Sequence, residues 1–276
     1  MLTLSYNQAT CKENSTVEQD LELCEKYGYK FIELRLDMLQ TYLQDHTYDD
    51  LRAFFSTHQL KPFALNSIEQ INFCSSAEWN ERVELFTFAC EVCREIKNPY
   101  IVVVPTVRED MLYKTEAEIF ADSVDVLNKL ADIAEPYGAK LAFEPIGDLR
   151  WCCRSQRQAL EIIQAVDRDN IGLVVDCINF YMHDKCSDLD FLGQLPPEKV
   201  FVFHINDCED VPLGVLDHCH RIMPGQGCIP IRDIVAALKS IGYNGPASLE
   251  LFRPEYWAMP AEDVFRLGRT ACLPYL

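Results

Sequence analysis

Short apolar runs alternate along the chain with longer segments in which apolar residues recur at helical spacing. The short runs predict eight strands, at residues 2–6, 31–34, 62–65, 100–104, 141–143, 172–175, 200–205 and 247–251. The longer segments predict helices at residues 16–27, 48–58, 78–96, 116–137, 156–166, 231–241 and 261–271, with a weaker helix around Leu189. The strand runs are continuous rather than alternating, which is typical of a parallel sheet covered by helices.

The order of these elements predicts the fold class. Eight strand-plus-helix units follow one another without a Gly/Ser-rich linker or a break in composition. Predicted helices end at Gly28, Gly138 and Gly242, and glycine favours the left-handed conformation that terminates a helix. A doubly wound sheet is the alternative, but no G-x-G-x-x-G motif follows the first strand. We therefore predict an α/β protein with one domain over residues 1–276, a single (β/α)8 TIM barrel.

Composition and charge limit the partners of the protein. The 276 residues include 43 Asp+Glu and 25 Lys+Arg, which gives a formal charge of −18. Nucleic acids and anionic membranes attract clustered basic residues, and the sequence contains no such cluster. No run reaches the roughly 18 apolar residues of a membrane span, and the first residues do not resemble a signal peptide. The 13 dispersed cysteines, including the Cys90 and Cys93 pair in a predicted helix, indicate reduced thiols in a cytoplasmic protein.

Candidate chemistry lies at the ends of four successive predicted strands. Glu144 ends the fifth strand, Asp176 the sixth, His204 lies on the seventh and Glu250 on the eighth. The carboxyl ends of barrel strands meet at one face, so these side chains are expected to lie together. Three carboxylates and an imidazole match the ligand preferences of Zn²⁺, Mn²⁺, Fe²⁺ or Co²⁺. The sequence therefore predicts one divalent-metal site.

The same segments resemble the xylose isomerase-like TIM barrels, and in more detail the inosose isomerases of bacterial inositol catabolism. The motifs that carry the broader resemblance are Phe143-Glu144-Pro145, Val175-Asp176, Phe203-His204-Ile205-Asn206-Asp207, Pro224-Gly225-Gln226-Gly227, and Ile241-Gly242-Tyr243 leading to Ser248-Leu249-Glu250. The motifs that carry the closer resemblance are Asn7-Gln8-Ala9-Thr10 and residues 20–26, 133–138, 168–170 and 250–256. This resemblance extends from the first strand to the last helix.

The resemblance implies an isomerase that converts 2-keto-myo-inositol to 1-keto-D-chiro-inositol in inositol catabolism. It implies metal binding by Glu144, Asp176, His204 and Glu250, with zinc, manganese or cobalt as the ion. Proton transfer through an enediolate needs a positioned base, and Glu144 and Glu250 are the expected catalytic pair. No phosphate-binding loop rich in Lys and Arg is evident, so an unphosphorylated polyol is the expected small-molecule substrate. The oligomeric state is left open.

Further residues follow predicted strands and are candidates for binding substrate hydroxyls. Arg35, Asn66 and Arg253 come after the second, third and eighth strands. Glu33, on the second strand, is expected either to act in catalysis or to support the metal ligands. One departure from the family concerns Asn179, because relatives often have a histidine three residues after the aspartate of the sixth strand. Asn179 can hydrogen-bond a hydroxyl but does not titrate near neutral pH, and His183 is the nearest imidazole in the sequence.

Three other functions share parts of this pattern. A ketose 3-epimerase or another sugar isomerase would use the same metal and glutamate pair. A DNA-repair endonuclease of the same superfamily is disfavoured by the charge of −18 and by the presence of only six histidines. A metal-free binding barrel would keep the carboxylates without using them.

Overall fold

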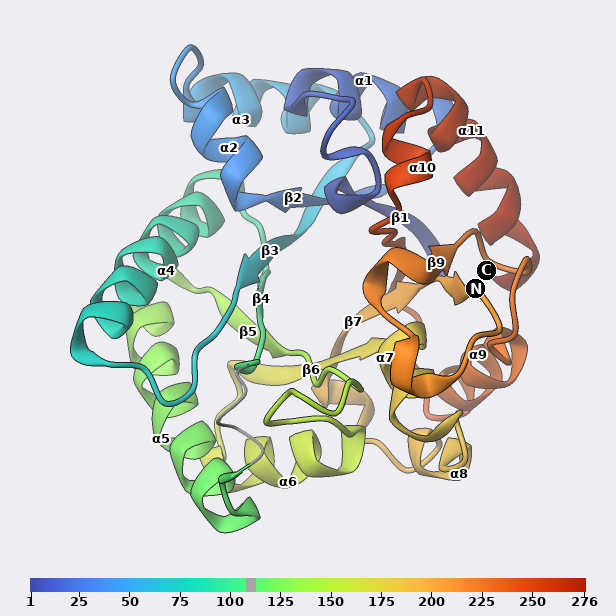
Figure 1. Ribbon diagram of the computed structural model, residues 1–276. Coiled ribbons are helices and arrows are strands. Elements are labelled where there is room, and N and C mark those ends of the chain that lie inside the picture. Colours follow the sequence, from blue (N-terminus) through green and yellow to red (C-terminus); the bar gives the residue numbers. More distant parts are fainter. Residues whose placement is uncertain (108–112) are drawn as a thin grey trace.

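Eight parallel strands close into a barrel in the computed structural model, which describes residues 1–107 and 113–276 (Figure 1). Around the barrel the strands follow the order β1, β10, β7, β6, β5, β4, β3, β2. Their bounds are β1 Thr3–Asn7, β2 Phe31–Arg35, β3 Lys61–Ile68, β4 Tyr100–Val103, β5 Lys140–Phe143, β6 Ile171–Asp176, β7 Val200–Ile205 and β10 Pro246–Leu249. The predicted (β/α)8 barrel is confirmed.

Helices surround the barrel on its outside (Figure 1). The longer ones are α1 Val17–Tyr27, α3 Tyr48–Thr57, α4 Ser76–Ile96, α5 Glu116–Ala134, α6 Gln156–Val166, α9 Ile231–Ser240 and α11 Ala261–Cys272. Their positions agree with the predicted helices, except that α5 stops at Ala134 and continues as a 3-10 turn over Glu135–Tyr137. Pro136 lies in that turn and cannot donate a backbone hydrogen bond.

Short helices follow strands directly and were not predicted. They are α2 Leu36–Tyr42, α7 Cys177–Asp184 and α10 Pro254–Trp257. A fourth short helix, α8 Leu189–Leu192, is the weaker helix that was predicted around Leu189. Each has at most eight residues, too few for a clear helical period in the sequence. The chain between β7 and α9 also contains a small antiparallel pair, β8 Asp207–Cys208 and β9 Arg221–Ile222, with the 3-10 turn η6 His218–His220 before β9.

Local signals in the sequence explain where the long helices begin and end. Thr16 caps the first turn of α1 by accepting a hydrogen bond from the backbone N–H of Gln19, whose side chain accepts from the Thr16 N–H in return. At the other end, Gly28 adopts φ 73°, a left-handed conformation in which its N–H reaches back into the helix. The reciprocal cap recurs at α3, α4 and α5.

Apolar side chains pack on both faces of the sheet. The larger cluster lies between the strands and the helices and includes Leu141, Leu173 and Phe203. A smaller cluster fills the inside of the barrel with side chains that alternate with these along the strands, among them Ala142 and Val202. The small hydroxyl side chains of Ser5 and Ser248 also lie inside the barrel, whereas the buried acidic side chains and the histidine there lie near the carboxyl ends of the strands.

None of the helices in the described parts of the chain is both long and apolar enough to cross a membrane.

Candidate metal centre

Four buried polar residues meet at the carboxyl end of the barrel. Successive side chains of a strand point to opposite faces of the sheet, so residues two apart point the same way. Ala142, Val174 and Val202 face the inside of the barrel, and Glu144, Asp176 and His204 follow them by two residues. Glu250 follows the buried Ser248 in the same way. One ligand atom from each of the four lies within 4.8 Å of the others. All four side chains are almost inaccessible to solvent. The structure thus brings together the four residues that the sequence predicted as metal ligands.

The imidazole of His204 is held between one carboxylate on one side and three on the other. Its Nε2 lies 3.2 Å from Oε2 of Glu33 on β2. Its Nδ1 lies 3.1 Å from Glu250, 3.5 Å from Glu144 and 3.6 Å from Asp176, yet forms no hydrogen bond with any residue described. A histidine that gives one ring nitrogen to a carboxylate and keeps the other for a ligand is typical of metal sites. The contact of Glu33 with the ring of His204 fits the supporting role, one of the two roles expected for Glu33.

The two glutamates of the cluster differ in their surroundings. Glu250 accepts hydrogen bonds at Oε1 from Asn7 and Asn66, and at Oε2 from Arg221. Burial raises the pKa of Glu250, but the charges of His204 and Arg221 outweigh burial and hold it well below its usual range. Glu144 accepts one hydrogen bond, of 3.0 Å, from the side chain of Asn179.

Glu144 has a correspondingly different protonation equilibrium. Burial raises its pKa to about 7, against the lowering influence of His204. The two carboxylates therefore differ in how readily each takes up a proton. The strands that carry them, β5 and β10, have β6 and β7 between them in the barrel.

Arg221 belongs to the site and was not predicted from the sequence. Its guanidinium, almost fully buried, contacts both Glu250 and Asp176, at 3.2 Å from the latter. It comes from β9, inside the long connection between β7 and α9, and no strand end marks it. The available signal was weak: Arg221 is the only Lys or Arg between residues 200 and 231 and shortly precedes the Pro-Gly-Gln-Gly motif.

A buried aspartate fixes the loop that carries Arg221. The carboxylate of Asp207 accepts hydrogen bonds from the backbone N–H groups of Cys208, Gly225, Gly227 and Ile229. A β-carbon at Gly227 would lie 2.0 Å from the carbonyl oxygen of Cys208, so only glycine fits there. The motifs at residues 203–207 and 224–227 therefore act together to close this loop beside the four predicted metal ligands.

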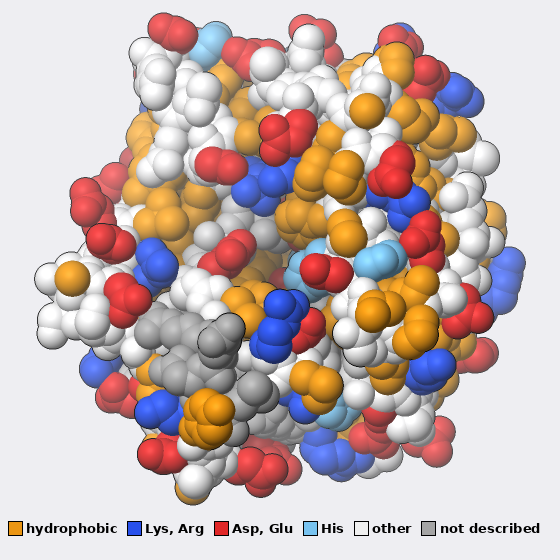
Figure 2. Space-filling model, in the orientation of Figure 1, with side chains coloured by type: hydrophobic (Ala, Val, Ile, Leu, Met, Phe, Trp, Pro, Cys, Tyr) orange, Lys and Arg blue, Asp and Glu red, His pale blue; other side chains and the backbone are white. Residues whose placement is uncertain are grey.

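A cavity of about 220 Å³ opens above the four-residue cluster. Figure 2 shows the hollow near the centre of this face, with acidic, basic and histidine side chains around it. The cavity is lined by Asn66, Ser67, Glu69, Val104, Glu144, Ile146, Trp151, His218, Arg221, Glu250 and Phe252. One part of the lining is charged and another part is apolar, which suits a small molecule with several hydroxyl groups.

The structure separates the four predicted substrate contacts into two groups. Asn66 lines the cavity, and Asn179 is buried behind it against Glu144. Arg35 does not line the cavity and pairs with Asp37 at 2.8 Å. Arg253 also lies outside the lining, where it pairs with two glutamates that follow β7 and β10.

The histidine that reaches the cavity is not the one nearest in sequence. His183, on α7, lines a different and smaller pocket with residues of α6. His218, on η6, lines the cavity of the metal ligands and was not among the predicted residues. Asp176 caps α7, because its carboxylate accepts a hydrogen bond from the backbone N–H of Asn179. The helix then carries His183 away from the barrel mouth.

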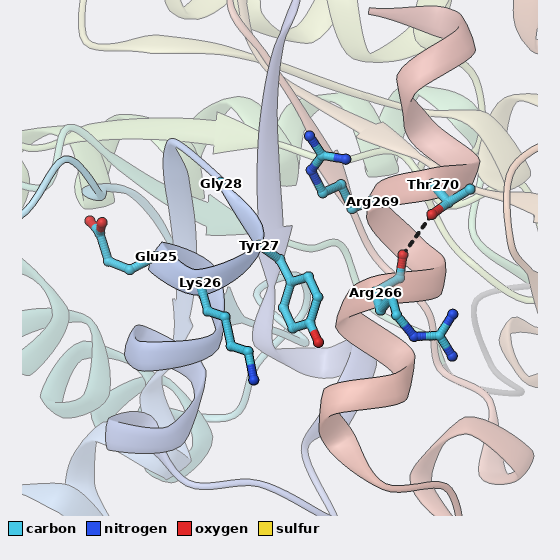
Figure 3. Close-up of a pocket in the computed structure, with 7 residues that line it drawn as sticks. All are labelled: Glu25, Lys26, Tyr27, Gly28, Arg266, Arg269 and Thr270. Atoms are coloured by element: carbon cyan, nitrogen blue, oxygen red, sulfur yellow. Dashed lines mark hydrogen bonds between the residues drawn. The ribbon is translucent and has the colours of Figure 1, made fainter.

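A larger pocket, of about 370 Å³, lies between the end of α1 and α11 (Figure 3). Lys26 and Tyr27 there bind Glu262, and Arg266 pairs with Asp263 at 3.0 Å. Figure 3 shows the charged side chains pointing in different directions rather than at a common point. Positive charges at the ends of helices also offset the helix dipole. This pocket lacks the convergent geometry of the barrel mouth.

Comparisons with known proteins show the family and the fold of the chain. A family model for the xylose isomerase-like TIM barrel matches residues 21–271. Inosose isomerase of Bacillus subtilis (strain 168) is 43% identical over 269 residues, covering 97% of this chain and 95% of the relative. The enzyme of the same name from Bacillus velezensis is 42% identical over 97% of this chain and 95% of its own length. A crystal structure of the IolI protein with a bound zinc atom superposes with a TM-score of 0.94 and 41% identity, covering 100% of this chain and 99% of that one.

Proposed function

Because the chain belongs to the xylose isomerase-like TIM barrel family, we propose that it is a metal-dependent inosose isomerase. The proposed reaction converts 2-keto-myo-inositol to 1-keto-D-chiro-inositol in inositol catabolism. Relatives of 41–43% identity over nearly the whole chain are named for this activity. The observation that carries the proposal is the buried cluster of Glu144, Asp176, His204 and Glu250 at the barrel mouth.

The residues of the cluster fit a divalent metal ion. Carboxylate oxygens and an imidazole nitrogen are ligands for zinc, manganese and cobalt. The buried Nδ1 of His204 has no hydrogen bond in the described chain and faces the three carboxylates. Three buried carboxylates at such short separations repel one another, and Arg221 contacts only two of them. Zinc is supported by the IolI structure, and manganese and cobalt are the other ions proposed.

The chemistry combines polarisation with proton transfer. A divalent ion held by Glu144, Asp176, His204 and Glu250 would polarise the ketone and the neighbouring hydroxyl, and so acidify the C–H bond beside the carbonyl. One glutamate of the pair Glu144 and Glu250 takes the proton from the carbon that bears the hydroxyl, and the electron pair of that bond forms an enediolate. The other glutamate gives a proton to the former carbonyl carbon. The hydroxyl proton passes to the former carbonyl oxygen, so atoms and electrons balance.

Neighbouring residues hold this pair in place and contact the substrate. Arg221, Asn7 and Asn66 fix the carboxylate of Glu250, and Asn179 fixes that of Glu144. We propose that Asn66 and Asn179 also bind substrate hydroxyls. The proposed contacts of Arg35 and Arg253 would require these side chains to leave their ion pairs with acidic neighbours.

The cellular setting is part of the same proposal. We propose that the chain forms one domain that acts in the cytoplasm on an unphosphorylated polyol. None of the 13 cysteines forms a disulfide bond in the structure, and most of them are buried, which is typical of a reducing compartment. The formal charge of −18 disfavours nucleic acid as a partner.

A proton-exchange experiment tests the proposed function. Purified protein loaded with Zn²⁺, Mn²⁺ or Co²⁺ would be incubated with 2-keto-myo-inositol in D₂O and followed by NMR. We expect 1-keto-D-chiro-inositol to form, with deuterium at a ring carbon, and both to disappear after treatment with a chelator. D-fructose serves as a parallel substrate, and faster conversion of D-fructose would favour a ketose 3-epimerase. A fully metal-loaded protein that exchanges no proton of the inosose would contradict the proposal.

A further inference from the structure

We propose that His218 contacts the substrate directly and binds a ring hydroxyl through its imidazole. This inference rests on the proposed inosose isomerase function and adds a residue that neither the predicted site nor the relatives' names supply. His218 lines the same cavity as Glu144, Glu250 and Arg221. Among the described residues that line this cavity, His218 is the only histidine.

The position of His218 is fixed from two sides. Its backbone N–H donates a hydrogen bond of 2.6 Å to the carboxylate of Asp217 at the start of the 3-10 turn. Its ring lies against the ring of Phe252, with centroids 5.9 Å apart and the planes tilted by 39°. Phe252 follows the proposed ligand Glu250 by two residues, and the guanidinium of Arg221 lies 5.1 Å from the Phe252 ring. Phe252 therefore holds the ring of His218 beside the proposed ligands, and Arg221, which binds Glu250, contacts the same Phe252 ring.

The ring nitrogens of His218 are available to a ligand. Within the described chain, neither nitrogen forms a hydrogen bond or an ion pair, although the side chain is only partly exposed. Burial and the nearby charge of Arg221 lower the pKa of His218 to about 4, so the ring is neutral at physiological pH. A neutral imidazole has one donor and one acceptor. A polyol hydroxyl has the same two capacities, so the two groups are complementary.

His220 provides a matched control on the same turn. It lies two residues from His218, and its Nδ1 already accepts a hydrogen bond of 3.0 Å from the backbone N–H of Asp217. It does not line the cavity. Replacing His220 therefore removes an imidazole from the same loop without removing a group from the proposed substrate site.

The test compares His218→Ala, His218→Gln and His220→Ala in the zinc-loaded protein. Steady-state kinetics with 2-keto-myo-inositol give kcat and KM, and competition with a chelator gives zinc affinity. We expect His218→Ala to lower kcat/KM by about tenfold, the contribution of one hydrogen bond to substrate. Zinc affinity should stay within about twofold, as expected for a change that leaves the ligands untouched. His218→Gln, which keeps a donor and an acceptor, should recover part of the loss, and His220→Ala should match wild type.

Other outcomes would overturn the inference. A kcat/KM for His218→Ala equal to that of wild type would remove His218 from substrate binding. A parallel loss of zinc affinity and kcat/KM in His218→Ala, without recovery in His218→Gln, would instead make the residue a structural support for Arg221.

A direct binding measurement separates this inference from the proposed function. The ring signals of His218 would be followed by NMR in zinc-loaded wild type as myo-inositol, which carries no ketone, is added. A shift of these signals supports the contact even if wild type does not isomerise the inosose, whereas unchanged signals at saturating polyol contradict it. Wild-type inactivity on the inosose would overturn the proposed function alone.

Discussion

Two charged regions of this molecule differ in how their side chains are held. At the barrel mouth, four ligating side chains from four strands approach within 4.8 Å of one another and are almost entirely buried. At the end of α1, Lys26 and the arginines of α11 surround a larger pocket, but Lys26 and Arg266 pair there with exposed neighbours. The same α1 also carries a buried carboxylate, Asp20, whose partner is the neutral side chain of Gln8 at 2.7 Å.

The difference shows what marks a site for chemistry in this fold. The volume of a pocket does not mark the site, since the pocket beside α1 is larger than the cavity at the barrel mouth. Burial of a single carboxylate does not mark such a site either, because Asp20 is buried next to the neutral side chain of Gln8 and no other charged group of the described chain converges on it. The mouth differs because buried carboxylates converge on one point while an imidazole nitrogen faces the same point. Such an arrangement is costly unless a cation compensates it.

The largest effect is expected from the glutamate pair. Glu250→Gln keeps the size and one oxygen but removes the base, so turnover should fall by about 10²- to 10⁴-fold while some metal still binds. Glu144→Gln should behave alike if both residues carry protons, and should mainly lose metal affinity if only Glu250 does. Turnover and deuterium incorporation measure this, with the exposed Glu22→Gln as a charge-matched control. Near-normal turnover in both variants would end the two-glutamate mechanism.

Asp20 sharpens the comparison through the pH dependence of stability. Burial raises the pKa of Asp20 from 3.8 to about 7. A raised pKa in the folded state stabilises the fold at low pH, and this contribution is lost as the pH rises from about 4 to about 7. Asp20→Asn removes the effect, so its stability relative to wild type should increase over this range by at most about 4 kcal/mol.

Urea unfolding of Asp20→Asn and wild type at several pH values measures that difference. Glu22→Gln, an exposed carboxylate on the same helix, controls for the change in net charge. A constant difference between Asp20→Asn and wild type across the pH range would show that Asp20 titrates normally in the folded protein.

Loss of the imidazole is expected to weaken the metal centre. His204→Ala removes the imidazole and leaves only the three carboxylates of the cluster to bind the metal, so metal affinity should fall by at least about tenfold. Metal content after dialysis against a weak chelator measures this, with circular dichroism to establish that the variant is folded. Full occupancy in the variant would exclude His204 as a ligand.

The smallest effect is expected at the α1 and α11 pocket. Arg269 forms no ion pair with any residue in the described ranges, and it lines the pocket beside α1 rather than the cavity at the barrel mouth. Arg269→Ala should leave turnover and metal affinity within about twofold of wild type, as is usual for surface substitutions. The same two assays measure this. A tenfold loss would mean that the pocket beside α1 contributes to the reaction and would remove the contrast between the two regions.

The sequence by itself determined the barrel and the set of four. Continuous apolar runs indicated strands buried on both faces, and Glu144, Asp176, His204 and Glu250 stood where those runs end. A parallel barrel brings successive strand ends to one face, and the two-residue period of a strand decides which side chains point inward. Both rules depend only on order and spacing, so they can be read without the structure.

The tertiary structure decided which other groups join the four. Arg221 and His218 come from a long connection whose path depends on the Asp207 hydrogen bonds and on the packing of Phe252. His183 lies nearer to Asp176 in sequence, but the helix that Asp176 caps carries it into another pocket. Loops have no fixed period, so the direction of their side chains is set by contacts between residues distant in the chain, and those contacts exist only once the barrel has closed.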